Sequence, residues 1–147
     1  VGVQIGAAVK NIIAIAAGLC VGLKLGDNTQ AALVSRGMNE MLNLDKVFDF
    51  DVKTLYGLSG LGDLIATCYS PHSRNRELGI LIAQGYTRLD AQKKIGMVSE
   101  GINACRILSS MNVDTPICDE VYKILFENAD PTNSLNNLMR RNLKDEN

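Results

Sequence analysis

The segment VQIGAAVKNIIAIAAGLCVGLKL, residues 3–25, decides the fold of this chain. It is apolar almost all round, and its glycines and alanines leave room for neighbouring elements to pack closely. Its β-branched residues would also suit a strand, but its length and alanine content favour a helix. Because a helix that is apolar on every side is typical of a buried position, we expect residues 3–25 to form a central helix.

The composition of the 147 residues is that of about one globular domain, with 46% hydrophobic residues and a formal net charge of −1. This near-neutral balance gives no reason to expect a nucleic acid or an anionic membrane as a partner. The apolar run at residues 12–21 is too short to span a membrane, and Lys10 and Lys24 flank it. Four scattered cysteines and a single histidine make a metal site unexpected and fit reduced thiols in a cytoplasmic protein.

Apolar residues recur at helical spacing in the rest of the chain, and no convincing strand alternation interrupts them. The fold class is therefore predicted to be all-α, with one compact domain. Residues 45–51 are expected to form a polar connector, and Arg36, Asn39 and Glu40 a solvated helix face. Cap and end signals predict helices at residues 30–44 and 52–56, from Ser73 to Gly85, from Thr87 or Asp90 to Ile95, after Ser99, and after Thr115-Pro116 and Asp130-Pro131.

The segment GLSGLGDLIATCYSPHSRNRELG, residues 57–79, is where we expect chemistry. Its glycines free the backbone around one carboxylate, Asp63, and let a ligand approach the main chain closely. Ser73 can cap a helix whose first turn carries Arg74, Asn75 and Arg76. The unpaired N–H groups of such a turn attract anions, whereas arginines there oppose the helix dipole. The pattern indicates either a bound anion such as phosphate or a solvated arginine pair.

Two further polar positions are candidates for a site. Lys10, beside Asn11 on the apolar first helix, either extends to the surface or lies in a cleft where desolvation lowers its pKa toward values useful for proton transfer. Glu100, in the turn GMVSEG at residues 96–101, either accepts hydrogen bonds from a hydroxyl-rich ligand or belongs to an ordinary helix start capped by Ser99.

Three segments carry a resemblance to a known family: VGVQIGAAVKN at the start, SGLGDLIATCYSPHSRNRELG in the middle and GMVSEG later. In this order and spacing they resemble the C-terminal helical domain of the bacterial-type NAD(P)-dependent glycerol-3-phosphate dehydrogenases. The resemblance covers nearly the whole chain. It implies that residues 1–147 form a 6-phosphogluconate-dehydrogenase C-terminal-like domain that lacks its Rossmann partner. It also implies an oxidoreductase that interconverts sn-glycerol 3-phosphate and dihydroxyacetone phosphate with NAD or NADP, feeding glycerophospholipid synthesis.

The same resemblance assigns roles to single residues. Lys10 matches the catalytic lysine, which contacts the substrate and exchanges a proton with its oxygen. Asp63 matches a carboxylate that orients a substrate hydroxyl and tunes Lys10. The other substrate-binding matches are Ser73, Arg74, Asn75, Asn11 and Thr67, and the cofactor-binding matches are Arg74, Val98 and Glu100.

The chain also departs from the family pattern. Gln4 stands where the family often has a glutamate, so any ion pair made there is lost or becomes a neutral hydrogen bond. No G-x-G-x-x-G motif follows a strand, and the first residue is Val1. We therefore expect part of a longer polypeptide that lacks the main cofactor platform and is inactive alone. The family resemblance, together with the large apolar fraction, also implies a homodimer. The sequence does not choose between NAD and NADP.

Two other interpretations stay open at this point. One is a related Rossmann-partnered dehydrogenase for a hydroxyacid or ketopantoate, although the SRNR turn speaks against a substrate that carries a carboxylate in place of a phosphate. The other is a helical dimerisation module without a site, for which Lys10, Asp63 and Arg74 would not converge.

Overall fold

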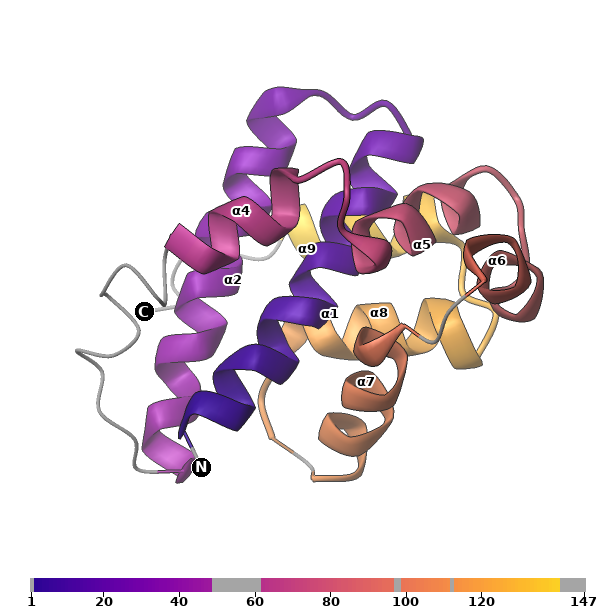
Figure 1. Ribbon diagram of the computed structural model, residues 1–147. Coiled ribbons are helices and arrows are strands. Elements are labelled where there is room, and N and C mark those ends of the chain that lie inside the picture. Colours follow the sequence, from indigo (N-terminus) through magenta and orange to yellow (C-terminus); the bar gives the residue numbers. More distant parts are fainter. Residues whose placement is uncertain (1, 49–61, 97–98, 112, 141–147) are drawn as a thin grey trace.

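The computed structural model describes residues 2–48, 62–96, 99–111 and 113–140. These residues form helices without a strand, which confirms the predicted all-α class (Figure 1). None of the described helices is long and apolar enough to cross a membrane. The helices are α1 (Gly2–Gly22), α2 (Asp27–Phe48), α4 (Asp63–Tyr69), α5 (Arg74–Ala83), α6 (Arg88–Ile95), α7 (Glu100–Ser110), α8 (Pro116–Phe126) and α9 (Pro131–Met139).

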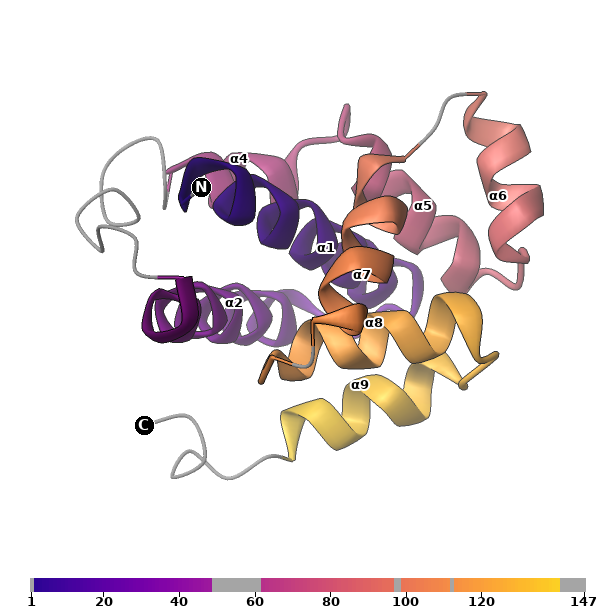
Figure 2. The same ribbon diagram turned by 90° about the horizontal axis from the view of Figure 1, so that it is seen from below.

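Helix α1 occupies the centre of the molecule, as its sequence predicts. Every residue from 12 to 20 is buried, and α1 contacts α2, α4, α5, α7 and α8. Figure 2 shows α1 between α4 on one side and α2 and α9 on the other. It ends at Gly22 rather than near residue 25, because Lys24 and Gly26 take positive φ angles of 58° and 91° that turn the chain out of the helix.

The crossing of α1 and α5 is closer than side chains would permit. A Cβ atom on Gly18 would lie 1.9 Å from the carbonyl oxygen of Arg76, and one on Gly79 would lie 2.1 Å from the carbonyl oxygen of Ile15. Such distances are far below van der Waals contact, so each helix needs a glycine where it meets the other backbone. The crossing therefore fixes where α5 begins relative to α1.

Most of the predicted helix boundaries in the second half of the chain are confirmed. The side chains of Ser73, Thr87 and Asp130 each accept a hydrogen bond from a first-turn N–H group of α5, α6 and α9 respectively. Pro116 and Pro131 stand in the first turns of α8 and α9, where a missing N–H group costs nothing. The cap residues and prolines in the sequence were therefore sufficient to predict where these helices begin.

One prediction about the first half was wrong, and one helix there was not predicted. Helix α2 begins at Asp27 and continues to Phe48, so the first part of the predicted connector is helical. Helix α4 was not predicted, because the glycines before it suggested a loop. Leu64 and Cys68, four residues apart, are buried and give α4 its core face. The predicted helix at residues 52–56, with Gly57 and Gly60, lies outside the described residues.

Glu40 also corrects the sequence prediction, which placed it on a solvated face. Its side chain is only 4% exposed. One carboxylate oxygen accepts a hydrogen bond from the N–H of Ile117, and the other lies 3.4 Å from the N–H of Cys118. Since Thr115 makes no side-chain cap, Glu40 from α2 supplies acceptors to the first turn of α8.

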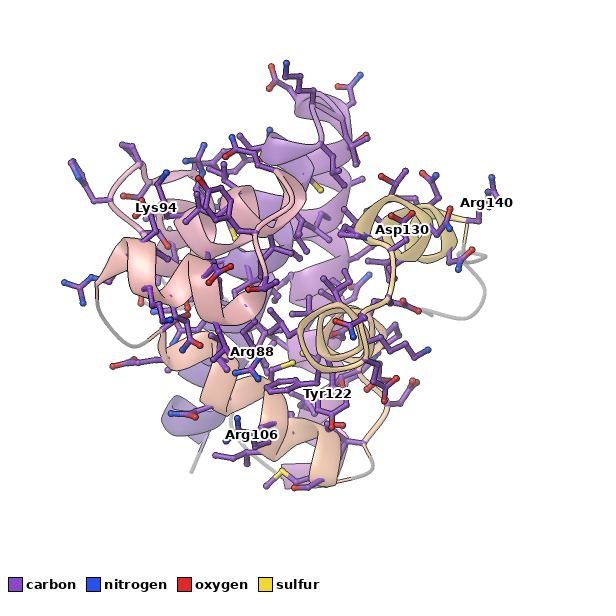
Figure 3. The ribbon with its side chains drawn as sticks, turned by 90° about the vertical axis from the view of Figure 1, so that its right-hand side faces the viewer. Arg88, Lys94, Arg106, Tyr122, Asp130 and Arg140 are labelled. Atoms are coloured by element: carbon purple, nitrogen blue, oxygen red, sulfur yellow. The ribbon has the colours of Figure 1, made fainter. Side chains whose placement is uncertain are left out.

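Arginines join α6 and α7 to the end of α8. The guanidinium carbons of Arg88 and Arg106 lie 4.6 Å and 5.1 Å from the centre of the Phe126 ring, which itself packs on Tyr122. Figure 3 shows Arg88 and Arg106 beside Tyr122 on this face of the molecule. Cation–π contacts of this kind hold α6 and α7 against α8.

Candidate functional site

A cavity of about 500 Å³ opens where the N-termini of α5 and α7 meet the C-terminal half of α4. Two helix N-termini at one cavity create a positive potential from backbone N–H groups alone. The arrangement suits an anion. The cavity is lined by Ala66, Thr67, Ser70, His72, Ser73, Arg74, Asn75, Ser99 and Glu100.

The wall formed by α5 follows from its local sequence. Ser70 adopts an extended backbone, and its Oγ accepts a hydrogen bond from the N–H of His72. Ser73 then caps α5, with its Oγ 3.2 Å from the N–H of Arg76. Because this cap satisfies one first-turn N–H group, the earlier N–H groups of α5 remain for a ligand at the cavity. The exposed side chain of Arg74 stands at the same end of the helix.

The two arginines of this turn have different surroundings, although the sequence suggested that they could act as a pair. Arg74 lines the cavity. Arg76 is half-buried and absent from the described lining, and its buried Nε has no hydrogen-bond partner among the described residues. Its backbone carbonyl meets Gly18 at the α1–α5 crossing. Arg74 is therefore the arginine available to a ligand.

Asn75 joins the two walls of the cavity. Its Oδ1 accepts hydrogen bonds from the Oγ of Ser99 and from the N–H of Gly101, the latter at 3.0 Å. Ser99 is buried and was predicted to cap α7 with its own side chain, but it makes no such hydrogen bond. Asn75 of α5 supplies the acceptor instead. Glu100, the first residue of α7, is thereby placed at the cavity with an exposed side chain.

Lys10 and Asp63 form an ion pair between α1 and α4. Lys10 Nζ lies 2.9 Å from Asp63 Oδ2, and their side chains are 20% and 57% exposed. Asp63 is the first residue of α4, where a carboxylate is favoured by the helix dipole. Thr67, one turn further along α4, lines the cavity. The pair therefore links Lys10 to the helix that carries one wall of the cavity, and Lys10 does not simply extend into solvent.

Asn11 follows Lys10 on α1 and approaches the start of α7. Its carbonyl oxygen lies 3.1 Å from the position that a Cβ atom on Gly101 would occupy. The main chain at Asn11 thus packs against Gly101, the residue whose N–H group donates to Asn75. Val98, the remaining predicted site residue, lies outside the described residues.

The structure thus gathers Thr67, Ser73, Arg74, Asn75 and Glu100 at one cavity and pairs Lys10 with Asp63. Sequence reasoning missed the roles of Ser99 and Gly101, because a serine before a helix is most simply interpreted as its cap. It also gave no role to His72, which lines the cavity. Among the described residues no group of three or more His, Cys, Asp or Glu side chains could hold a metal ion.

Comparison with known proteins gives a consistent result. A family model described as NAD-dependent glycerol-3-phosphate dehydrogenase C-terminus matches residues 1–136. The glycerol-3-phosphate dehydrogenase (NAD(P)+) of Clostridium acetobutylicum is 49% identical over an alignment of 150 residues that covers 99% of this chain and 45% of that protein. The chain therefore spans about half the length of the curated relatives that it matches.

Solved structures show the same similarity. The crystal structure of glycerol-3-phosphate dehydrogenase from Coxiella burnetii superposes with a TM-score of 0.90 at 40% identity, covering 95% of this chain and 44% of that one. The glycerol-3-phosphate dehydrogenase structure from Saccharomyces cerevisiae gives a TM-score of 0.84 at 28% identity, covering 95% of this chain and 42% of that one.

Proposed function

The chain belongs to the family described as NAD-dependent glycerol-3-phosphate dehydrogenase C-terminus, and from this premise we propose that it is the substrate-binding and proton-transfer part of such an enzyme. The proposed reaction interconverts dihydroxyacetone phosphate and sn-glycerol 3-phosphate with NAD or NADP. The observation that carries the proposal is the pairing of Lys10 with Asp63 on the helix whose next turn lines an anion-suited cavity.

Lys10 is proposed to exchange the proton. In reduction its ammonium group gives a proton to the oxygen on carbon 2 as negative charge develops there, and in oxidation the neutral amine takes the proton of the hydroxyl group. The nicotinamide cofactor, when bound, gives or takes the hydride at the same carbon. Asp63 holds Lys10 in place through their 2.9 Å contact and, being partly exposed, can also accept a hydrogen bond from a substrate hydroxyl.

The phosphate group is proposed to bind at the start of α5. Arg74 supplies a permanent positive charge, and the first-turn N–H groups of α5 supply aligned donors. Ser73 and Asn75 flank Arg74 at the same cavity. Asn11 and Thr67 are proposed to contact the substrate on the α1 and α4 side. An anionic group gains more from these donors than a neutral or cationic group, because hydrogen bonds to an ionised acceptor are stronger.

We propose that this chain contributes only part of a dinucleotide site. The described residues are helical and form no strand–turn–helix unit of the kind that binds a dinucleotide diphosphate. Arg74 and Glu100 nevertheless fit such a ligand at the cavity, because one can pair with a phosphate and the other can accept from ribose hydroxyls. We propose that a separate dinucleotide-binding domain supplies the remaining contacts, with Val98 near the cofactor, and that this chain is inactive without it.

Further partners are proposed on the same basis. Ile65 and Tyr69, one turn apart on α4, are each 43% exposed and form an apolar surface on this helix that the dinucleotide-binding domain could cover. A homodimer is proposed from the family, and sedimentation that shows only monomer at high concentration would count against it. All four cysteines are buried and unpaired, which fits the reducing cytoplasm.

The experiment is an activity assay on this chain fused to the dinucleotide-binding half of the Clostridium acetobutylicum relative. We expect NADH or NADPH oxidation that depends on dihydroxyacetone phosphate, and a fall in kcat of about 100- to 10,000-fold on Lys10→Ala. Lys93→Ala, which removes an exposed lysine from α6, should have no effect.

Turnover by the unfused chain would contradict the proposed division of labour. Stronger inhibition by a carboxylate-bearing than by a phosphate-bearing substrate analogue would favour a hydroxyacid or ketopantoate enzyme instead. A helical module without a site predicts that the fusion is inactive with either substrate class.

A further inference from the structure

The amide of Asn75 has only one orientation that fits its surroundings. The N–H of Gly101 is a donor and cannot accept, so the atom 3.0 Å from it must be the Asn75 oxygen. The Ser99 hydroxyl donates to the same oxygen. The NH2 group is then the part of the side chain left for the cavity that Asn75 lines.

Gly101 makes this arrangement possible. A Cβ atom at residue 101 would lie 2.7 Å from Asn75 Oδ1 and 2.7 Å from Ile15 Cδ1. It would also approach the carbonyl oxygen of Asn11 to 3.1 Å, so the start of α7 sits directly on α1 and α5. Ser99 is only 1% exposed, so its hydroxyl cannot hydrogen-bond to bulk water instead of Asn75.

We propose that Ser99 and Gly101 are positioning residues that hold the Asn75 amide so that its NH2 group faces the cavity as a donor. Through the same two contacts the N-terminus of α7, with Glu100, is coupled to the N-terminus of α5, with Arg74. This inference rests on the proposed function of the cavity as a phosphate site. It gives Asn75 a defined polarity toward the ligand: its NH2 group donates to an acceptor such as a phosphate oxygen, and its oxygen, already held by Ser99 and Gly101, does not accept from a ligand hydroxyl.

Substitutions of Asn75 separate the two halves of its side chain. Asn75→Asp keeps acceptors for Ser99 and Gly101 but replaces the NH2 group with a second carboxylate oxygen. Asn75→Ala removes both halves. We expect Asn75→Asp to retain the protection of the Gly101 amide against hydrogen exchange and to lose phosphate binding, whereas Asn75→Ala loses both.

Substitutions of Ser99 test the positioning role itself. On the isotope-labelled chain, Ser99→Ala should speed exchange of the Gly101 amide and raise the dissociation constant of inorganic phosphate, each by about three- to tenfold, as expected for one neutral hydrogen bond. Ser99→Thr, which keeps the hydroxyl, should restore much of both. Ser110→Ala, at the far end of α7, is the matched control and should change neither.

The double variant Ser99→Ala/Asn75→Ala should be no worse than Asn75→Ala alone, because both act on one contact. Independent, additive effects on Gly101 exchange, or protection of the Gly101 amide unchanged by either substitution, would overturn the positioning role. The exchange measurement needs no ligand. Absence of phosphate binding by the unsubstituted chain would therefore contradict the proposed phosphate site, while the exchange rates still decide whether Ser99 holds Asn75.

Discussion

Glu40 gives the prediction that can be worked out most fully from the structure. Its carboxyl group is buried between α2 and the start of α8, and burial raises its pKa from an ordinary value of 4.5 to about 7. The N–H groups of Ile117 and Cys118 act in the opposite direction, and the negative charge of Asp119 adds to the effect of burial. Arg36 and Asp114 are the other charged residues around the small cavity beside Glu40.

The sign of the pH dependence follows from the raised pKa. Between pH 4.5 and about 7 the folded chain holds a proton on Glu40 that the unfolded chain has lost. The stabilisation is therefore complete below 4.5 and disappears as the pH rises through about 7. Within this interval the unfolding free energy changes by about 1.4 kcal/mol for each pH unit, which gives a total stabilisation of about 3 kcal/mol. About 2.5 kcal/mol of this stabilisation is lost between pH 5 and pH 8.

The assay is urea unfolding followed by circular dichroism, at several values from pH 5 to pH 8, for the unsubstituted chain and Glu40→Gln. Because glutamine does not titrate, the difference between the two unfolding free energies isolates residue 40. We expect the unsubstituted chain to lose about 2.5 kcal/mol relative to Glu40→Gln over this range. Glu127→Gln, an exposed change at the other end of α8, should show no such trend. A difference that rises with pH would mean that the two N–H donors and the α8 dipole outweigh burial, and would refute the reasoning.

Three further predictions concern packing, thiols and the cavity. Gly79→Ala should destabilise the fold by about 1–3 kcal/mol or more, because its Cβ would lie 2.1 Å from a backbone oxygen. Gly62→Ala should be tolerated, because Gly62 has helical φ and ψ and open space around it. Equal unfolding midpoints for the two variants would contradict the close crossing. The four buried thiols should react with dithionitrobenzoate at pH 8 only after unfolding, and rapid reaction of the native chain would show that they are accessible. Burial raises their pKa values to about 11 for Cys20, to about 12 for Cys68 and Cys105, and well above the ordinary value for Cys118. Asp63→Asn should change the unfolding free energy by no more than about 1 kcal/mol, as expected for a half-exposed ion pair. A larger loss of unfolding free energy would give the pair a structural role.

Local signals in the sequence predicted those parts of the fold that depend on neighbouring residues. The central position of α1 follows from its apolar surface, and the starts of α5, α6 and α9 follow from Ser73, Thr87 and Asp130, each within three residues of the N–H group that it caps. The candidate residues around the SRNR turn were also found by sequence reasoning.

Contacts between residues distant in the sequence could not be predicted in the same way. Glu40 caps a helix that begins more than seventy residues later, and Asn75 replaces the expected serine cap of α7 across 26 residues. In both cases a cap from another helix satisfies the N–H groups, and no local pattern reveals it. Helix α4 was missed for a different reason, since the glycines preceding it masked the helical spacing of Leu64 and Cys68.

Calorimetric titration with sn-glycerol 3-phosphate, of the unsubstituted chain and of Arg74→Ala, tests most directly whether the cavity between α5 and α7 is a phosphate site. We predict that the unsubstituted chain binds sn-glycerol 3-phosphate, binds inorganic phosphate more weakly and does not bind glycerol. Loss of one charge-assisted contact should weaken binding to Arg74→Ala by about 10- to 100-fold. Equal affinities of the two proteins for sn-glycerol 3-phosphate, or binding of glycerol as strong as that of its phosphate, would contradict the account.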